Sequence, residues 1–190
     1  MLGTHNSMTF GKPYHWYGWF MIPFARCQSK NLKEQFIAGA RCFDIRVRFD
    51  NNGEPYFCHG LFRIKGKVKP ALMTLERLAK EYKVLIGVRI ILEDKKLNDF
   101  QEKMFVVFCQ KFEQRFRNLI PFEGRRKGDW KVIYHFPNSL QLDQMVSSVD
   151  NEARWYEKFI PFAFACRKNQ QNRLLEKHKF FNKTVLFDFL

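Results

Sequence analysis

The chain has 190 residues, of which 46% are hydrophobic and 27% charged, with 33 lysines and arginines against 19 aspartates and glutamates. This composition favours one globular domain over residues 1–190 and excludes a disordered chain, while the short, charge-interrupted apolar runs exclude a membrane-spanning segment. The formal net charge of +14 favours anionic partners, of which acidic lipid and nucleic acid are the main candidates.

The first half of the chain shows one helix signal and two strand signals. Asn31 is followed three residues later by Glu34 and then by Gly39, which predicts a short capped helix. Residues 42–49 alternate between apolar and polar side chains, which predicts a strand with one polar face. A turn signal at residues 51–53 separates this strand from an extended segment that ends at His59.

The second half continues the alternation of helices and strands. Residues 72–83 have helical spacing, and the mostly apolar run 84–94 predicts a strand buried on both faces. A long helix is expected from Asn98, with Gln101 as its capping partner. The remaining expected segments are a basic loop at 121–129, a strand at 130–136, mostly helix at 151–180 and a closing strand at 183–190. This order predicts an α/β fold with a parallel sheet, open or closed into a barrel.

Titratable residues fall on or just after the expected strands. Functional side chains of parallel α/β folds gather at the carboxyl ends of their strands. Histidine suits general acid and base work, and arginine can hold a phosphate by two parallel hydrogen bonds. The sequence therefore suggests phosphodiester chemistry, against the alternative of a surface ion pair on a half-exposed strand. The residues concerned are His5, Asp44, Arg46, His59, Glu93 and Asp188.

Three linked motifs resemble one known family. They are GTHNS at residues 3–7, CQSKNLKEQFIAGARCFDIRVRF at residues 27–49 and FCHG at residues 57–60. Together they resemble the catalytic X region of phosphatidylinositol-specific phospholipase C, nearer the bacterial enzymes than the eukaryotic ones. The resemblance implies a distorted or minimal TIM barrel as a single domain, and the early first motif leaves room for only a short opening strand.

The resemblance also implies a reaction. The inositol 2-hydroxyl attacks the neighbouring phosphate, which gives diacylglycerol and a cyclic inositol phosphate. By matching position, His5 is the general base and His59 the general acid. Arg46 clamps the phosphate, Asp44 holds Arg46 and the acid in place, and Asp188 steadies the base.

Position 46 bears on the question of a metal cofactor. Eukaryotic relatives place a carboxylate there and use calcium, whereas bacterial relatives place an arginine there. Arg46 therefore favours a reaction without metal or other cofactor, because a guanidinium repels a nearby dication. Calcium is the alternative, since Asn6, Asp44 and Glu93 offer the oxygen ligands that it prefers. Without calcium, we expect Asn6 and Glu93 to bind substrate.

Residues 14–20 form an aromatic segment, YHWYGWF, expected as a loop or short helix. Aromatic side chains with a polar handle favour the bilayer interface, and the resemblance implies a membrane-docking rim beside the active site. The alternative is a packed hydrophobic lid. The expected docking residues are Trp16, Tyr17, Trp19 and Phe20. Attraction to acidic lipid is expected from Lys12, Lys65, Lys67 and Lys69.

Three further functions compete with a phospholipase. A weak or inactive lipid-binding module gains support because the bacterial relatives are longer. A basic nucleic-acid binder would explain the charge, but the sequence has no recognised nucleic-acid motif. Glycerophosphodiesterases of a related barrel usually begin with His-Arg, whereas Asn6 follows His5.

The cysteines and the N-terminus bear on partners and location. The five cysteines are odd in number and none forms a C-x-x-C pair, so we expect reduced structural thiols. No secretory signal is expected, because a basic stretch followed by an apolar run is missing at the start. We expect a monomer that acts on membranes containing phosphatidylinositol or glycosyl-phosphatidylinositol, without a specific nucleic acid. By resemblance it is secreted or peripheral on a membrane.

Overall fold

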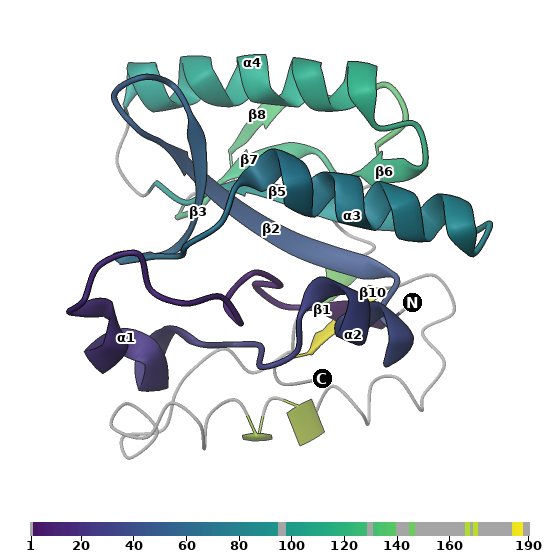
Figure 1. Cartoon of the computed structure of the whole chain (residues 1–190). Helices are drawn as coiled ribbons and strands as arrows, with labels where there is room; N and C mark the ends of the chain where they lie inside the picture. Colours follow the sequence, from purple (N-terminus) through teal and green to yellow (C-terminus); the bar gives the residue numbers. More distant parts are fainter. Residues whose placement is uncertain are drawn as a thin grey trace.

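A mainly parallel sheet with helices beside it forms the molecule (Figure 1). The computed structural model describes residues 2–94, 98–128 and 131–139, together with 145–146, 166–167, 169–170 and 184–187. The strands are β1 (Leu2–Thr4), β2 (Cys42–Phe49), β3 (Pro55–His59), β4 (Phe62–Arg63), β5 (Ile86–Leu92), β6 (Leu119–Pro121), β7 (Gly124–Arg126), β8 (Val132–Tyr134), β9 (Met145–Val146) and β10 (Thr184–Phe187). The helices are α1 (Gly18–Ala25), α2 (Leu32–Ile37), α3 (Val68–Glu81) and α4 (Asp99–Arg115).

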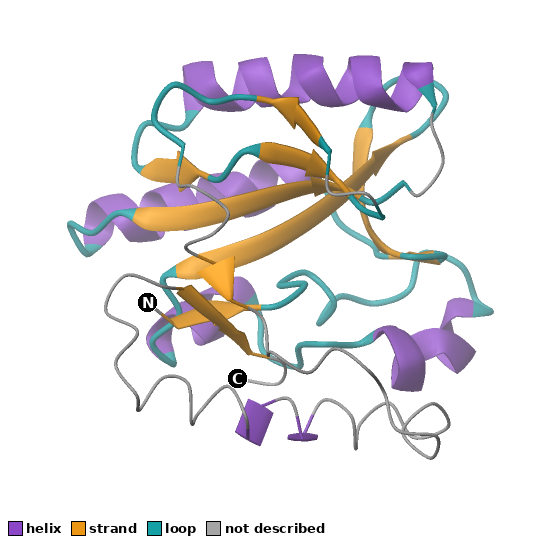
Figure 2. Cartoon of the chain, turned by 180° about the vertical axis from the view of Figure 1, so that it is seen from behind, coloured by secondary structure: helices purple, strands orange, loops and turns teal. Residues whose placement is uncertain are grey.

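The strand order in the main sheet is β8-β7-β5-β2-β1-β10-β9. β2 pairs in parallel with β1 and β5, and β1 pairs in parallel with β10, which places the start of the chain beside residues near its end (Figure 2). β3 pairs antiparallel with β2, and β8 antiparallel with β7. In the described part of the chain the sheet stays open between β8 and β9, so the architecture is that of a distorted, minimal barrel.

The predicted helix starts are present, with one difference. The Asn31 side chain accepts a hydrogen bond from the Glu34 N–H, and the Glu34 carboxylate accepts one from the Asn31 N–H. The Asn98 side chain likewise accepts from the Gln101 N–H. The Gln101 side chain does not complete a capping box, because it instead bonds the N–H and C=O of Phe49. Gln101 therefore ties the start of α4 to the end of β2.

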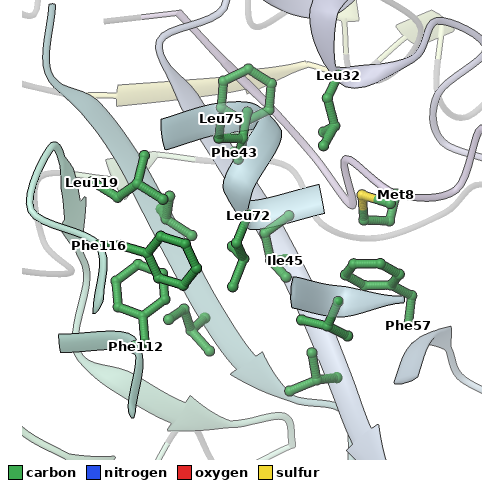
Figure 3. Close-up of a cluster of buried hydrophobic side chains, with 14 of the residues drawn as sticks. Met8, Leu32, Phe43, Ile45, Phe57, Leu72, Leu75, Phe112, Phe116 and Leu119 are labelled. Carbon is green, nitrogen blue, oxygen red and sulfur yellow. The ribbon is translucent and has the colours of Figure 1, made fainter. Parts of the chain in front are cut away.

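The core lies between β2 and the helices α3 and α4. Figure 3 shows Phe43 and Ile45 of β2 in one cluster with Leu72 and Leu75 of α3, and with Phe112 of α4. Because strand side chains alternate, the polar residues of β2 point away from this cluster. Asp44 and Arg46 are nevertheless buried and only Arg48, near the end of the strand, is partly exposed, so the half-exposed surface strand considered as an alternative is wrong for the first two. The polar face of β2 is an interior surface, and its charges need partners there.

The basic loop expected at 121–129 is wrong for residues 121–126. They contain the end of β6 and all of β7, which pairs with β5. Gly124 permits the close packing of β7 against α4, since an added Cβ would lie 2.8 Å from the Phe105 ring. The expected helix at 151–180 lies outside the described residues except 166–167 and 169–170, which are helical, and the closing strand is present as β10.

Candidate active site

Five of the six predicted site residues come together where β1, β2, β3 and β5 meet. His5 follows β1, Asp44 and Arg46 lie on β2, His59 ends β3 and Glu93 follows β5. They are linked by hydrogen bonds, by ion pairs and by the contact of the two imidazoles. The sixth, Asp188, lies outside the described residues.

Arg46 is the centre of this group. Its Nε donates to Asp44 Oδ2 at 3.1 Å, and one terminal nitrogen donates to Glu93 Oε2 at 3.2 Å. The other terminal nitrogen donates to His5 Nε2 at 2.7 Å. A guanidinium has five N–H donors, so two remain for an anionic group. Because arginine keeps its proton, His5 Nε2 must accept, and His5 is therefore neutral in this arrangement.

The loop that carries His5 is fixed by buried polar contacts. The Asn6 N–H donates to Asp44 Oδ2 at 3.0 Å, and Asn6 adopts a positive φ of 48°. Gln28 donates to the His5 carbonyl oxygen and Gln35 to that of Ser7. Sequence reasoning missed both glutamines, because a glutamine in a helical or loop pattern gives no sign of a partner far along the chain. These two hydrogen bonds fix the backbone on which His5, the candidate general base, is carried.

His59 faces His5 across the site. The ring centroids are 6.4 Å apart and the rings are nearly perpendicular, at 84°. The Nδ1–H of His59 donates to the Ala25 carbonyl oxygen at 2.8 Å. This bond fixes the tautomer and leaves Nε2 as the nitrogen that can exchange a proton with a bound group.

Glu93 links the arginine to the hairpin that carries His59, and it has a partner that sequence reasoning missed. Its carboxylate accepts from Arg46, from the Gly60 N–H at 2.9 Å and from Lys127 Nζ in a close contact. Lys127 follows β7, which the sequence presented as part of a basic loop. A second cation therefore lies at the edge of the site.

Burial and neighbouring charges set the protonation states of the two carboxylates. Burial by itself raises the pKa of Asp44, but the charges of Arg46 and then Arg89, together with the hydrogen bond from the Asn6 N–H, outweigh it, so that the pKa lies well below its usual value. Burial likewise opposes ionisation of Glu93, but Arg46 and Lys127 hold its pKa below the usual value. Both groups are therefore carboxylates at neutral pH.

The pKa of His59 is lowered in the free protein, whereas a general acid needs a protonated ring. Burial, followed by the positive charge of Arg46, lowers the pKa of His59 to about 4, although the bond to Ala25 opposes the shift. The ring is therefore neutral at pH 7 in the free protein. A bound phosphate anion would oppose the effect of Arg46 and favour the protonated ring.

This electrostatic arrangement predicts a measurable titration. The His59 ring signal in NMR spectra should titrate with a midpoint near pH 4 in the free protein. Saturating inorganic phosphate should raise that midpoint by roughly one to three pH units, as an opposite charge at close range does. His135, whose exposed ring contacts Glu123, is the internal reference and should not respond. A midpoint that is unaffected by phosphate would contradict the placement of an anion between Arg46 and His59.

The proposed calcium ligands do not fit a cation. The Arg46 guanidinium lies between Asp44 and Glu93 and donates to both, so a dication bound by these carboxylates would meet a fixed positive charge. Within the described residues, no group of three or more His, Cys, Asp and Glu side chains is arranged to hold a metal ion. The alternative ligand set of Asn6, Asp44 and Glu93 therefore carries no step of the reaction.

The aromatic segment lies beside the site, and its side chains face solvent. His59 bonds to Ala25, the last residue of α1, and α1 lies apart from α3 and α4 at the lower left of Figure 1. The exposed fractions of the four expected docking side chains are 49–77%, for Trp16, Tyr17, Trp19 and Phe20. Such exposure does not fit a packed hydrophobic lid. None of the helices in the described part is long and apolar enough to cross a membrane.

The open sheet with polar residues after its strands is of the TIM-barrel-like class, in which active sites lie at the carboxyl ends of the strands. The sequence model of the phosphatidylinositol-specific phospholipase C, X domain, matches residues 19–127. The chain belongs to this family and is a phosphatidylinositol-specific phospholipase C-like enzyme. The match includes Arg46, His59 and Glu93, whereas His5 precedes it.

Solved structures share the fold. The phosphatidylinositol-specific phospholipase C of Listeria monocytogenes has a TM-score of 0.65 and 16% identity, with coverage of 100% of this chain and 87% of its own. A mutant of the Staphylococcus aureus enzyme has a TM-score of 0.68 and 13% identity, with coverages of 100% and 84%. Another Staphylococcus aureus structure, which concerns modulation of membrane binding, has a TM-score of 0.60 and 16% identity, with coverages of 98% and 70%. At these identities the likeness shows the fold alone. No curated protein matches the chain.

Proposed function

We propose that the chain cleaves phosphatidylinositol-type lipids to diacylglycerol and a cyclic inositol phosphate. The observation that carries this proposal is the pair of imidazoles, His5 and His59, with centroids 6.4 Å apart and Arg46 beside them. General acid and base catalysis of phosphate transfer needs two groups on opposite sides of phosphorus and a fixed cation at its oxygens.

In the proposed reaction His5 accepts the proton of the inositol 2-hydroxyl. The hydroxyl oxygen forms a bond to phosphorus, and the bond from phosphorus to the glycerol oxygen breaks. His59 gives its Nε2 proton to that departing oxygen, so diacylglycerol leaves as a neutral alcohol. The neutral state of His5, which accepts from Arg46 without substrate, is the state that a base requires.

Arg46 is proposed to hold two phosphate oxygens with its remaining N–H donors and to stabilise the charge that develops there. Asp44 orients it through Nε and orients the His5 loop through Asn6 N–H. Asn6 Nδ2 is buried and has no hydrogen-bond partner in the described part of the chain, which supports donation from Asn6 to the substrate. Substrate contact by Glu93 stays a prediction, as does the support of His5 by Asp188.

The exposed aromatic side chains before and within α1 are proposed to dock on the membrane beside the site. Tryptophan and tyrosine side chains favour the interface between hydrocarbon and headgroups. Because Ala25 of α1 bonds to His59, the docking helix and the general acid candidate are in direct contact. A lipid headgroup at this surface would lie next to the group that protonates its glycerol oxygen.

The test follows hydrolysis of phosphatidylinositol vesicles by phosphorus NMR, in chelator and in calcium. We expect the cyclic inositol phosphate to form at the same rate in both, because Arg46 supplies the positive charge at the phosphate. Turnover that requires calcium would contradict the role of Arg46. No turnover in either condition, with vesicle binding retained, would favour a lipid-binding module that lacks activity.

A further inference from the structure

A second polar surface lies on the other face of the hairpin that carries His59. Strand side chains alternate, so Tyr56, three residues before His59, points to the opposite face of β3. There it lines a groove of about 830 Å³ together with Tyr14, Arg63 and residues at the start of α3. We call it the Arg63 groove. It is separate from the reaction centre, although both use the same hairpin.

Arg63 is held in a fixed orientation in this groove. Its guanidinium carbon lies 4.1 Å from the centroid of the Tyr14 ring and 4.0 Å from that of Tyr56. Its Nε has no hydrogen-bond partner, and no carboxylate among the described residues forms an ion pair with it. An arginine between two aromatic rings loses little freedom when it binds an oxyanion in its plane, because the rings already restrict it.

Three lysines extend this positive charge along one side of the groove. Lys65, Lys67 and Lys69 are exposed and have no ion-pair partner among the described residues. Two carboxylates also line the groove, but that of Asp50 accepts hydrogen bonds from the N–H groups of residues 52 and 54 in its own turn. Four cations therefore oppose two carboxylates, one of which, Glu54, faces the groove without such bonds.

The position of the groove favours a lipid headgroup over a soluble anion. The Tyr14 N–H donates to the Arg63 carbonyl oxygen at 2.9 Å, and the Lys65 N–H donates to that of Lys12 at 2.8 Å. Tyr14 lies two residues before Trp16, the first of the exposed aromatic residues that the proposed function places on the membrane. A protein docked through them would hold the groove at the level of the headgroups.

We propose that the Arg63 groove binds the phosphate of an acidic phospholipid that is not the substrate. Arg63 contacts the phosphate oxygens by its edge, and the lysines surround the headgroup with positive charge. Of the proposed function, this inference needs only the docking of the aromatic side chains on the membrane. It requires no catalytic step, so binding to a lipid that the enzyme does not cleave tests it separately.

The experiment measures sedimentation with vesicles of phosphatidylcholine and phosphatidylglycerol in equal parts, and with phosphatidylcholine alone. The groove variant combines Lys65→Gln, Lys67→Gln and Lys69→Gln, and the control combines Lys30→Gln, Lys33→Gln and Lys103→Gln. All six lysines are exposed and both variants lose the same charge. We expect the groove variant to bind acidic vesicles roughly a hundredfold more weakly, since a lysine near an anionic surface contributes about fivefold.

The control variant should bind acidic vesicles roughly tenfold or more tightly than the groove variant does. Neither variant should change binding to phosphatidylcholine or turnover of a soluble, monomeric phosphoinositol substrate. Equal losses in both variants would overturn the proposal in favour of general charge attraction. Binding of glycerol phosphate in solution as tight as binding to vesicles would overturn it in favour of a soluble anion.

Discussion

Replacing His59 with alanine is expected to lower kcat on phosphatidylinositol by roughly 10²- to 10⁴-fold, the range typical of a lost general acid or base. The loss should depend on the leaving group. Glycerol needs a proton as it departs, whereas an aryl group such as nitrophenolate leaves as a stable anion. With an aryl phosphoinositol substrate, the His59→Ala variant should therefore recover most of its activity.

The same pair of substrates distinguishes the two histidines. His5→Ala should lose activity equally on both, because the attacking hydroxyl must give up its proton whatever group departs. His135→Ala is the control, since His135 is exposed and lies outside both the site and the aromatic segment. If His5→Ala were rescued by the aryl group and His59→Ala were not, the roles of base and acid would be exchanged.

Arg46→Lys is expected to lower kcat by roughly 10²- to 10³-fold, which is the loss typical of one fixed donor at a developing oxyanion. Lysine keeps the charge between Asp44 and Glu93 but lacks the planar fork that contacts both carboxylates and His5 at once. The defect should appear in kcat more than in KM, because the contact is strongest when charge develops.

Arg41→Lys is the matched control, because Arg41 precedes the same strand and donates to the carbonyl oxygens of Phe36 and Ala40 outside the site. Melting temperatures of both variants show whether the fold is retained. A kcat for Arg46→Lys within a factor of a few of the unmodified protein, with the fold intact, would contradict the phosphate role.

The sequence indicated the reaction centre where the relevant signals are local. Alternation in residues 42–49 placed Asp44 and Arg46 on one face of a strand, and the structure places both on β2 in contact with each other. The Asn31 capping box was equally readable, because all its atoms lie within four residues. Such patterns depend on the local periodicity of the backbone and not on contacts with residues far along the chain.

The features that the sequence did not indicate depend on distant partners. The charge pattern places Lys127 in a basic loop, because residues 124–126 have the composition of a solvated turn. Only the pairing of Arg125 and Arg126 with β5 shows that they form a strand. Gln101 was read as a helix cap, yet its side chain bonds a strand residue 52 positions earlier. Arg89 was read as part of an apolar run, although it lies 4.0 Å from Asp44 in the interior. Each of these contacts is set by strand order, which local composition does not encode.

One oxygen atom, Asp44 Oδ2, accepts from both the backbone that positions the base and the side chain that holds the phosphate. Free energies of mutations at Asp44 and Arg46 are therefore expected not to add, because each change alters what the other contributes. In a descendant that lost catalysis, selection on these positions would be released together.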